Sequence, residues 1–250
     1  MRTVEATRYV TPLREGGSLP GLVEADDDGL YVLKFRGAGQ GPKALVAELV
    51  AGELARAAGL PVPEIVFVEL DPELGRAEPD PEIQELIAAS AGLNVGLDFL
   101  PGSLTYNPAA GPAPDASLAA DIVWLDALVT NVDRSPQNPN LLLWHGRLWL
   151  IDHGAAMYLQ HAWTDPPAEA RRPFGAIRNH VLLPFAGSIA DADARLAPRL
   201  GPDVLAAVLA RVPDDWFVPR ERAEYDEYLR LRLAPPRGFV TEAEEARNGA

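Results

Sequence analysis

Three polar side chains in the middle of the chain have types and a spacing that suit phosphoryl transfer. Four residues separate Asp133 from Asn138, and Asp152 follows fourteen residues after Asn138. Phosphoryl transfer needs one carboxylate near the attacking hydroxyl, and it needs hard oxygen ligands for the Mg²⁺ that bridges the phosphates. Because Asp and Asn are also ordinary turn formers, the prediction of a site rests on all three residues together.

The segments around these residues are predicted to be rigid elements that hold the three side chains close together. Before the loop, apolar residues recur at helical spacing, at Ile122, Leu125, Leu128 and Val129. Residues 131–140 then form a polar loop, because its two prolines exclude regular helix. Two short apolar strands are predicted at 141–144 and 148–151, joined by a hairpin turn at 145–147. The loop holds the first two polar residues, and Asp152 stands where the second strand ends.

The composition indicates a globular protein and excludes several kinds of site. A chain of 250 residues is long enough for one large domain or two lobes. The net charge of −14 argues against general binding to nucleic acids or anionic membranes, whereas a local positive site for ATP is still compatible with it. Without cysteine, the chain has no disulfide, iron–sulfur cluster or thiolate metal site. No signal peptide or membrane-length apolar run is visible, so we expect a cytoplasmic protein with no membrane span.

A lysine in the first hundred residues is a candidate partner for phosphate. Lys34 lies in a predicted strand at 31–35, where it either reaches solvent or meets an anion. A helix is predicted at 43–58, and it carries Glu48 and Glu53. This order allows Lys34 and a helix glutamate to pair, with the lysine held against nucleotide phosphates. For Glu53 we expect a solvated position on the helix face.

Two further segments are predicted to contact the nucleotide. A turn between two predicted strands carries small residues whose backbone N–H groups would cradle phosphates, namely Gly16, Gly17 and Ser18. A plain hairpin turn is the alternative for this segment. At the other end of the lobe, adenine is expected against the backbone from Asp98 to Leu100, because clefts at domain boundaries are common ligand sites.

The sequence as a whole predicts an α+β protein with two lobes. Residues 1–100 form a β-rich lobe and residues 118–234 form a mainly helical lobe. Between them, residues 101–117 are rich in Pro, Gly, Ala and Ser, lack periodicity, and are predicted to be the connecting hinge. The polar tail at 235–250 is expected to be flexible and frayed.

Together these residues resemble the HipA-like kinases, a bacterial branch of the protein-kinase-like superfamily, and more distantly the type II phosphatidylinositol 4-kinases. The resemblance rests on YVLKF with Lys34, AELVAGELARAAGLPVPE with Glu48, NVDRSPQNPNLL with Asp133 and Asn138, and LIDHG with Asp152. It implies a bilobal protein-kinase-like fold that binds ATP and Mg²⁺ between its lobes.

The resemblance also implies a role for each site residue. Asp133 would orient or deprotonate the acceptor hydroxyl, and Asn138 and Asp152 would coordinate the metal. Lys34 would steady the α- and β-phosphates, and Glu48 would position Lys34. The expected activity is therefore ATP- and Mg²⁺-dependent phosphotransfer to a hydroxyl-bearing acceptor.

Two alternative functions remain open at this point. A small-molecule kinase of the aminoglycoside or choline type shares the D-x4-N pattern, but such enzymes carry His-Gly before the acid, where this chain has Asn131 and Val132. A nucleotide-binding pseudokinase that acts as an interaction module is the second alternative, and the three filled polar positions argue against it. In LIDHG, His153 stands where protein kinases carry phenylalanine. The acceptor is left open among a protein serine or threonine, a lipid headgroup, a small alcohol and the enzyme itself.

Asp133→Asn tests the assignment of the catalytic acid. We expect the variant to keep its fold and its ATP binding, and to lose turnover by ~10²–10⁴-fold, the range for loss of a general base. The measurement is phosphotransfer from γ-labelled ATP by purified wild type and variant. Turnover equal to that of the wild type would mean that Asp133 is only a turn former.

Overall fold

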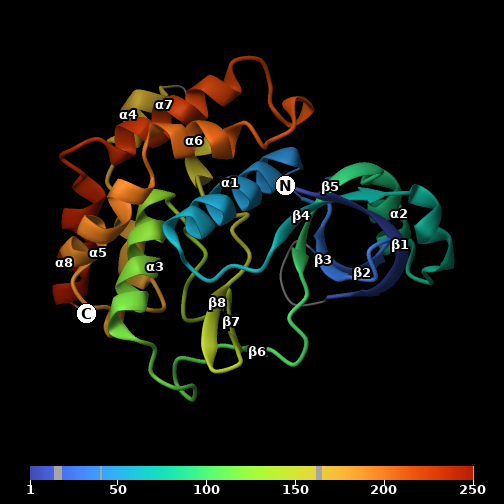
Figure 1. Cartoon of the computed structure of the whole chain (residues 1–250), viewed down its shortest axis with the longest axis horizontal. Helices are drawn as coiled ribbons and strands as arrows, with labels where there is room; N and C mark the ends of the chain where they lie inside the picture. The colour runs from blue at the N-terminus through green and yellow to red at the C-terminus, as the bar shows by residue number, and fades with distance from the viewer. Residues whose placement is uncertain (14–18, 40, 162–164, 250) are drawn as a thin grey trace.

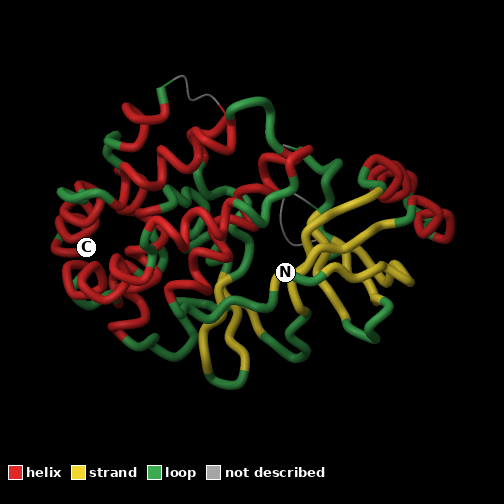
Figure 2. Tube along the Cα trace, turned by 45° about the horizontal axis from the view of Figure 1, so that its top comes forward, coloured by secondary structure: helices red, strands yellow, loops and turns green. Residues whose placement is uncertain are grey.

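Two parts with different secondary structure make up the chain, a strand-rich part and a helix-rich part (Figure 1; Figure 2). The computed structural model describes residues 1–13, 19–39, 41–161 and 165–249. Strands β1 to β5 and helix α2 lie at one end of the molecule, and most of the helices lie at the other end. This mixture of helices and strands agrees with the predicted α+β class.

Five strands near the N-terminus close into a barrel in the order β1-β2-β3-β5-β4. They are β1 (Thr3–Pro12), β2 (Gly21–Ala25), β3 (Leu30–Lys34), β4 (Ile65–Leu70) and β5 (Gly92–Asp98). Neighbouring strands are antiparallel except β1 and β4, which pair in parallel. Apolar side chains such as Val23 and Leu33 fill the interior, and α2 (Pro81–Ala89) packs against the same core. Because Lys34 ends β3, the barrel fixes its position.

Helix α1 (Pro42–Ala58) lies between the barrel and the helix-rich part. It matches the helix predicted at 43–58, and Gly59 ends it with a φ of 88°, the left-handed conformation that glycine adopts readily. Helix α1 contacts α6 (Pro202–Leu209), and Figure 1 shows the two side by side. Its buried residues, Leu49 among them, belong to the large apolar core of the helical part. The first hundred residues are therefore divided between two cores.

Helix α3 (Ala116–Leu128) is the centre of the helical part, and every residue from Ile122 to Leu128 is buried. Asp115 caps its first turn by accepting a hydrogen bond from Leu118 N at 2.9 Å. Further helices of this part are α4 (Pro166–Ala170), α5 (Ile189–Leu196), α6 and α7 (Glu221–Leu233). Within the described ranges, no helix is both long and apolar enough to cross a membrane.

The predicted hairpin is present, and a third short strand pairs with it. Its strands are β6 (Leu104–Thr105), β7 (Leu141–Trp144) and β8 (Arg147–Leu150). The turn consists of His145 and Gly146, whose φ angles of 48° and 73° are those that two-residue hairpins require. The second strand therefore begins one residue earlier than predicted. Strand β6 lies inside the connection 101–117, so that segment contributes to the sheet beside the hairpin.

The prediction of a frayed tail at 235–250 is wrong. Residues Gly238–Asn248 form helix α8, which packs against α3 and α5. Phe239 and Ala243 are buried, and the Phe239 ring meets the Trp124 ring edge-on with centroids 5.6 Å apart. The tail is helical because these two apolar residues, four positions apart, form one face that the helical core covers.

Candidate active site

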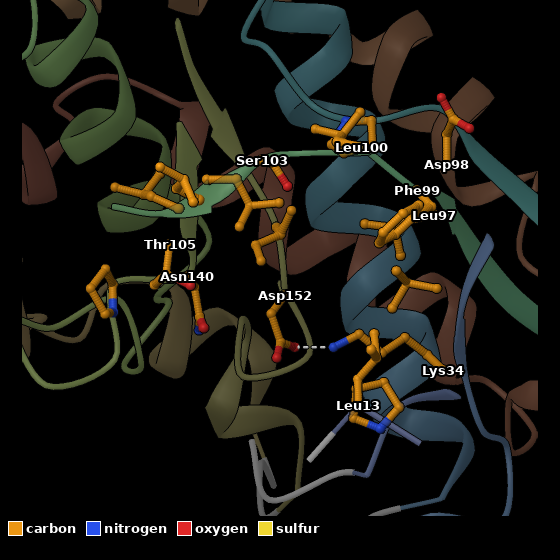
Figure 3. Close-up of a pocket in the computed structure, with 18 of the residues that line it drawn as sticks. Leu13, Lys34, Leu97, Asp98, Phe99, Leu100, Ser103, Thr105, Asn140 and Asp152 are labelled. Carbon is orange, nitrogen blue, oxygen red and sulfur yellow. Dashed lines mark ion pairs between the residues drawn. The ribbon is translucent and has the colours of Figure 1, made fainter. Parts of the chain in front are cut away.

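A cavity of about 710 Å³ lies between the barrel and the β6-β7-β8 sheet. Figure 3 shows several of the residues that line it. The lining includes Lys34 from β3, Asp98 at the end of β5 and Leu100 shortly after it, Asn138 from the polar loop, and Asp152 after β8. The volume is within the range of roughly 300–1,000 Å³ that is usual for sites of small ligands. The structure thus places five of the predicted site residues around one cavity.

Lys34 and Asp152 form an ion pair within this cavity, with 2.6 Å between Nζ and Oδ1 (Figure 3). The lysine is only 9% exposed. Burial lowers the pKa of its ammonium, but the carboxylates of Glu48 and Asp152 outweigh burial, and the pKa of Lys34 is raised. The lysine is therefore a charged group at neutral pH, suited to binding phosphate oxygens.

Asp152 has a φ of 54°, an uncommon conformation for a residue with a side chain. The next residue is held by Glu48, whose Oε2 accepts a hydrogen bond from His153 N at 2.9 Å. Glu48 Oε1 lies 3.4 Å from His153 Nδ1, and both side chains are buried. Burial raises the pKa of Glu48, but the Lys34 ammonium and the hydrogen bonds from His153 lower it to about 2. An ionised Glu48 therefore anchors the peptide that follows Asp152.

The ion-pair partners of the two glutamates of α1 differ from those that the sequence predicts. Among ion pairs between described residues, Lys34 is joined to Asp152 and not to Glu48, whose charge acts on the lysine from a greater distance. The expectation of a solvated Glu53 is wrong. This carboxylate is 4% exposed and pairs with Arg56 at 3.0 Å and with Arg211. The reason is that the helical part covers this face of α1, which the local sequence does not reveal.

Hydrogen bonds within the polar loop orient Asp133. Its Oδ2 accepts from Asn138 Nδ2 at 2.8 Å and from Asn140 Nδ2 at 3.3 Å. Its backbone N donates to Asn131 Oδ1 at 3.1 Å. The Asp133 charge also contributes to the raised pKa of Lys34. Asp133 itself does not line the cavity, but it is hydrogen-bonded to Asn138 and Asn140, which do.

The side chains that line the cavity would fit a divalent cation such as Mg²⁺. The Asn138 amide nitrogen faces Asp133, so its oxygen is the atom left for a cation. Asp152 supplies a carboxylate that lines the same cavity. No group of three or more His, Cys, Asp or Glu side chains among the described residues could hold a metal. Magnesium is commonly held by one or two protein oxygens together with phosphates and water, and that is the number of ligands available here.

A buried polar cluster beneath the loop was missed by the sequence analysis. Asp126 on α3 accepts hydrogen bonds from Asn131, Arg134 and His180, and all four side chains are buried. Burial raises the pKa of Asp126, but Arg134 and His180 outweigh burial and hold the pKa well below its ordinary range. Burial lowers the pKa of His180. The sequence signal that could have revealed this cluster is a carboxylate inside an apolar helix, next to the loop.

The predicted phosphate-binding turn cannot be placed, since Gly16, Gly17 and Ser18 lie outside the described residues. Leu13 and Pro20, which flank that segment, line the cavity. Asp98 and Leu100, beside which adenine is expected, also line the cavity. The Asp98 side chain is exposed and Leu100 is buried.

The fold is similar to those of solved structures of two kinases. The Helicobacter pylori proinflammatory kinase CtkA is similar in structure, with a TM-score of 0.61 and 13% sequence identity over 97% of this chain and 99% of that chain. The Golgi casein kinase with Mn/ADP bound has a TM-score of 0.54 and 13% identity over 98% of this chain and 74% of that chain. A second structure of the Golgi casein kinase has a TM-score of 0.55, also at 13% identity, over 98% and 72% of the two chains. No curated protein matches the sequence significantly.

These structural likenesses show a protein-kinase-like fold, and a family match in sequence adds to them. The model of the HipA-like kinase family matches residues 7–232. That range extends from β1 into α7 and includes the whole polar loop, the hairpin and every candidate site residue described above. The chain therefore belongs to the HipA-like kinase family.

Proposed function

We propose that this chain transfers the γ-phosphate of ATP to a hydroxyl group in a Mg²⁺-dependent reaction. One observation carries the proposal: Lys34, Asp152 and Asn138 line a single cavity, and Asn138 is bonded to Asp133. A structural neighbour, the Golgi casein kinase, holds Mn/ADP, which supports a nucleotide and a divalent cation as ligands. The proposal includes a bilobal arrangement, with the nucleotide between the barrel and the helical part.

Each cavity residue has a place in this proposal. Adenine lies against the segment from Asp98 to Leu100, where the walls are mainly apolar. The Lys34 ammonium leaves its carboxylate partner to bind phosphate oxygens. Asn138 Oδ1 and the carboxylate of Asp152 would hold Mg²⁺. When bound, Mg²⁺ neutralises negative charge on the phosphate oxygens.

Asp133 is proposed to act on the acceptor hydroxyl. The amides of Asn138 and Asn140 bind Oδ2 of this carboxylate, which leaves Oδ1 to take the proton. As the acceptor oxygen bonds to the γ-phosphorus, the bond from that phosphorus to the β–γ bridging oxygen breaks and ADP leaves. The direct experiment is a γ-labelled ATP assay on purified protein, alone and then with cell lysate separated into proteins and small molecules. Label transfer to a component of either fraction identifies the acceptor class.

Thermal melting separates metal-dependent nucleotide binding from simple stability. A ligand that binds only the folded state stabilises it by ~2.7 kcal/mol at a hundredfold excess over Kd. Each kcal/mol moves the melting temperature of a chain of this size by about 2–4 °C, so ATP with Mg²⁺ should raise it by roughly 5–10 °C. Asp152→Asn should lose most of the magnesium-dependent part, because it removes a hard carboxylate oxygen. With ATP plus chelator, the variant should keep the smaller, magnesium-independent rise in melting temperature, since the contacts of ATP with Lys34 and with the backbone remain.

The melts compare wild type and Asp152→Asn, each with ATP plus Mg²⁺ and with ATP plus chelator. A wild type that does not shift under either condition contradicts the kinase proposal. A shift that is indifferent to both magnesium and Asp152 instead favours a nucleotide-binding module without turnover.

Glu48→Gln and Glu53→Gln separate a role in the site from a role in packing. Glu48→Gln removes the charge that faces Lys34 and weakens the hold on His153, so turnover should fall ~10–100-fold, as for other residues that orient a metal site. Glu53→Gln weakens the ion pairs with two arginines that do not line the cavity, so it should lower the melting temperature and leave turnover per folded molecule unchanged. Turnover is measured at a temperature at which both variants are folded. Equal losses in the two variants would show that Glu48 affects only the fold.

A further inference from the structure

A fully buried arginine follows Asp133 directly and binds groups on three sides of the polar loop. The Arg134 side chain has no exposed surface, and its Nε donates to Asp126 Oδ2 at 2.6 Å. Its Nη1 donates to the carbonyl oxygen of Asn140 and, at 3.4 Å, to that of Ile151. The Arg134 carbonyl oxygen accepts from Val181 N at 3.0 Å. One side chain therefore joins α3, the end of the loop and the end of β8.

The two residues whose carbonyl oxygens accept from Arg134 Nη1 are neighbours of residues with a proposed role in phosphotransfer. Asn140 donates its amide hydrogen to Asp133, and Ile151 immediately precedes Asp152. Ile151 N also donates to the Asn140 carbonyl oxygen at 3.1 Å. The distance between the proposed base and the proposed metal ligand is thus set by backbone groups that share one guanidinium.

Two further donors hold Asp126 so that it can anchor the arginine. Asn131 Nδ2 donates to Asp126 Oδ1 at 3.0 Å, and His180 Nε2 lies 2.9 Å from Asp126 Oδ2. His180 Nδ1 accepts from Leu182 N at 3.1 Å. A neutral imidazole protonated on Nε2 satisfies both contacts, and the lowered pKa of His180 agrees with that form. The carboxylate therefore has partners on both oxygens.

We propose that Arg134 is a positioning residue that fixes Asp133 relative to Asp152 for phosphotransfer. The inference rests on the proposed function. A planar guanidinium can bind a carboxylate and two carbonyl oxygens at once, whereas a lysine ammonium acts as a point charge and cannot reproduce that geometry. Burial of the pair is not itself a reason for its presence, because apolar side chains of similar volume often stabilise a fold as well or better. The geometry of the bonds at Asn140 and Ile151 is what an apolar replacement would lose.

A double variant separates positioning from stability. Arg134→Met alone leaves Asp126 buried without its cation and should strongly lower the melting temperature. Adding Asp126→Asn removes the second charge, so the melting temperature should recover in large part. Turnover should not recover: we expect ADP release ~10–100-fold below wild type, and a Mg²⁺ concentration for the half-maximal ATP-induced melting shift about tenfold higher, as for loss of groups that orient metal ligands. The smaller shift produced by ATP in chelator should remain, because Arg134 does not touch Lys34.

The matched control is another arginine–aspartate pair, outside the cavity lining. Arg237 Nε and Nη2 both donate to the Asp193 carboxylate at 2.6 Å. The double variant Asp193→Asn with Arg237→Met should keep wild-type turnover and magnesium dependence. If the double variant at Asp126 and Arg134 regains wild-type turnover along with its stability, the positioning role is overturned while the proposed function stands. A wild type with neither ADP release nor a magnesium-dependent shift overturns the proposed function, and this inference with it.

Discussion

The candidate site depends on keeping one buried lysine charged. An ammonium that is removed from water keeps its proton only when carboxylates replace the lost hydration. Asp152 at the end of the hairpin pairs with Lys34 directly, and Glu48 on α1 and Asp133 on the polar loop add their charges. The barrel supplies the cation, and three other elements supply the anions. These elements must therefore pack together in one arrangement for Lys34 to stay charged and for the site to form.

Helix α1 shows how this constraint is met. At its start, Lys43 Nζ pairs with Glu221 Oε1 of α7 at 3.2 Å. At its end, the Ala58 carbonyl oxygen accepts from Arg199 Nη1 at 2.6 Å. Because its apolar face also joins the larger core, α1 is fixed to the helical part at both ends. Glu48 is consequently positioned by the helical part, whereas Lys34 is positioned by the barrel, and the cavity lies where the two meet.

Local patterns in the sequence were sufficient for the elements that carry the site, and insufficient for contacts between distant segments. The spacing of apolar residues and the residue types of the turns predicted α1, the hairpin and the strand of Lys34, because these elements depend on residues close together in the sequence. The choice of Asp152 as the partner of Lys34 depends on how the barrel meets the hairpin. Likewise, the burial of Glu53, the ordering of α8 through Phe239 and the bonds to Asp126 all need a second segment far away in the chain. For α8, the four-residue spacing of Phe239 and Ala243 is compatible with a helix face but does not indicate which segment covers it. The other contacts leave no periodic signal.

The most direct test of the account is a crystal structure with Mn²⁺ and a non-hydrolysable ATP analogue, in which anomalous scattering locates the metal. We predict one Mn²⁺ within coordination distance of an Asp152 carboxylate oxygen and Asn138 Oδ1, in the cavity that Lys34 lines. We also predict that Lys34 Nζ has left Asp152 for a phosphate oxygen. Nucleotide bound elsewhere, or Mn²⁺ remote from Asp152 while the Lys34–Asp152 pair stays intact, would contradict the assignment of this cavity as the site of phosphotransfer.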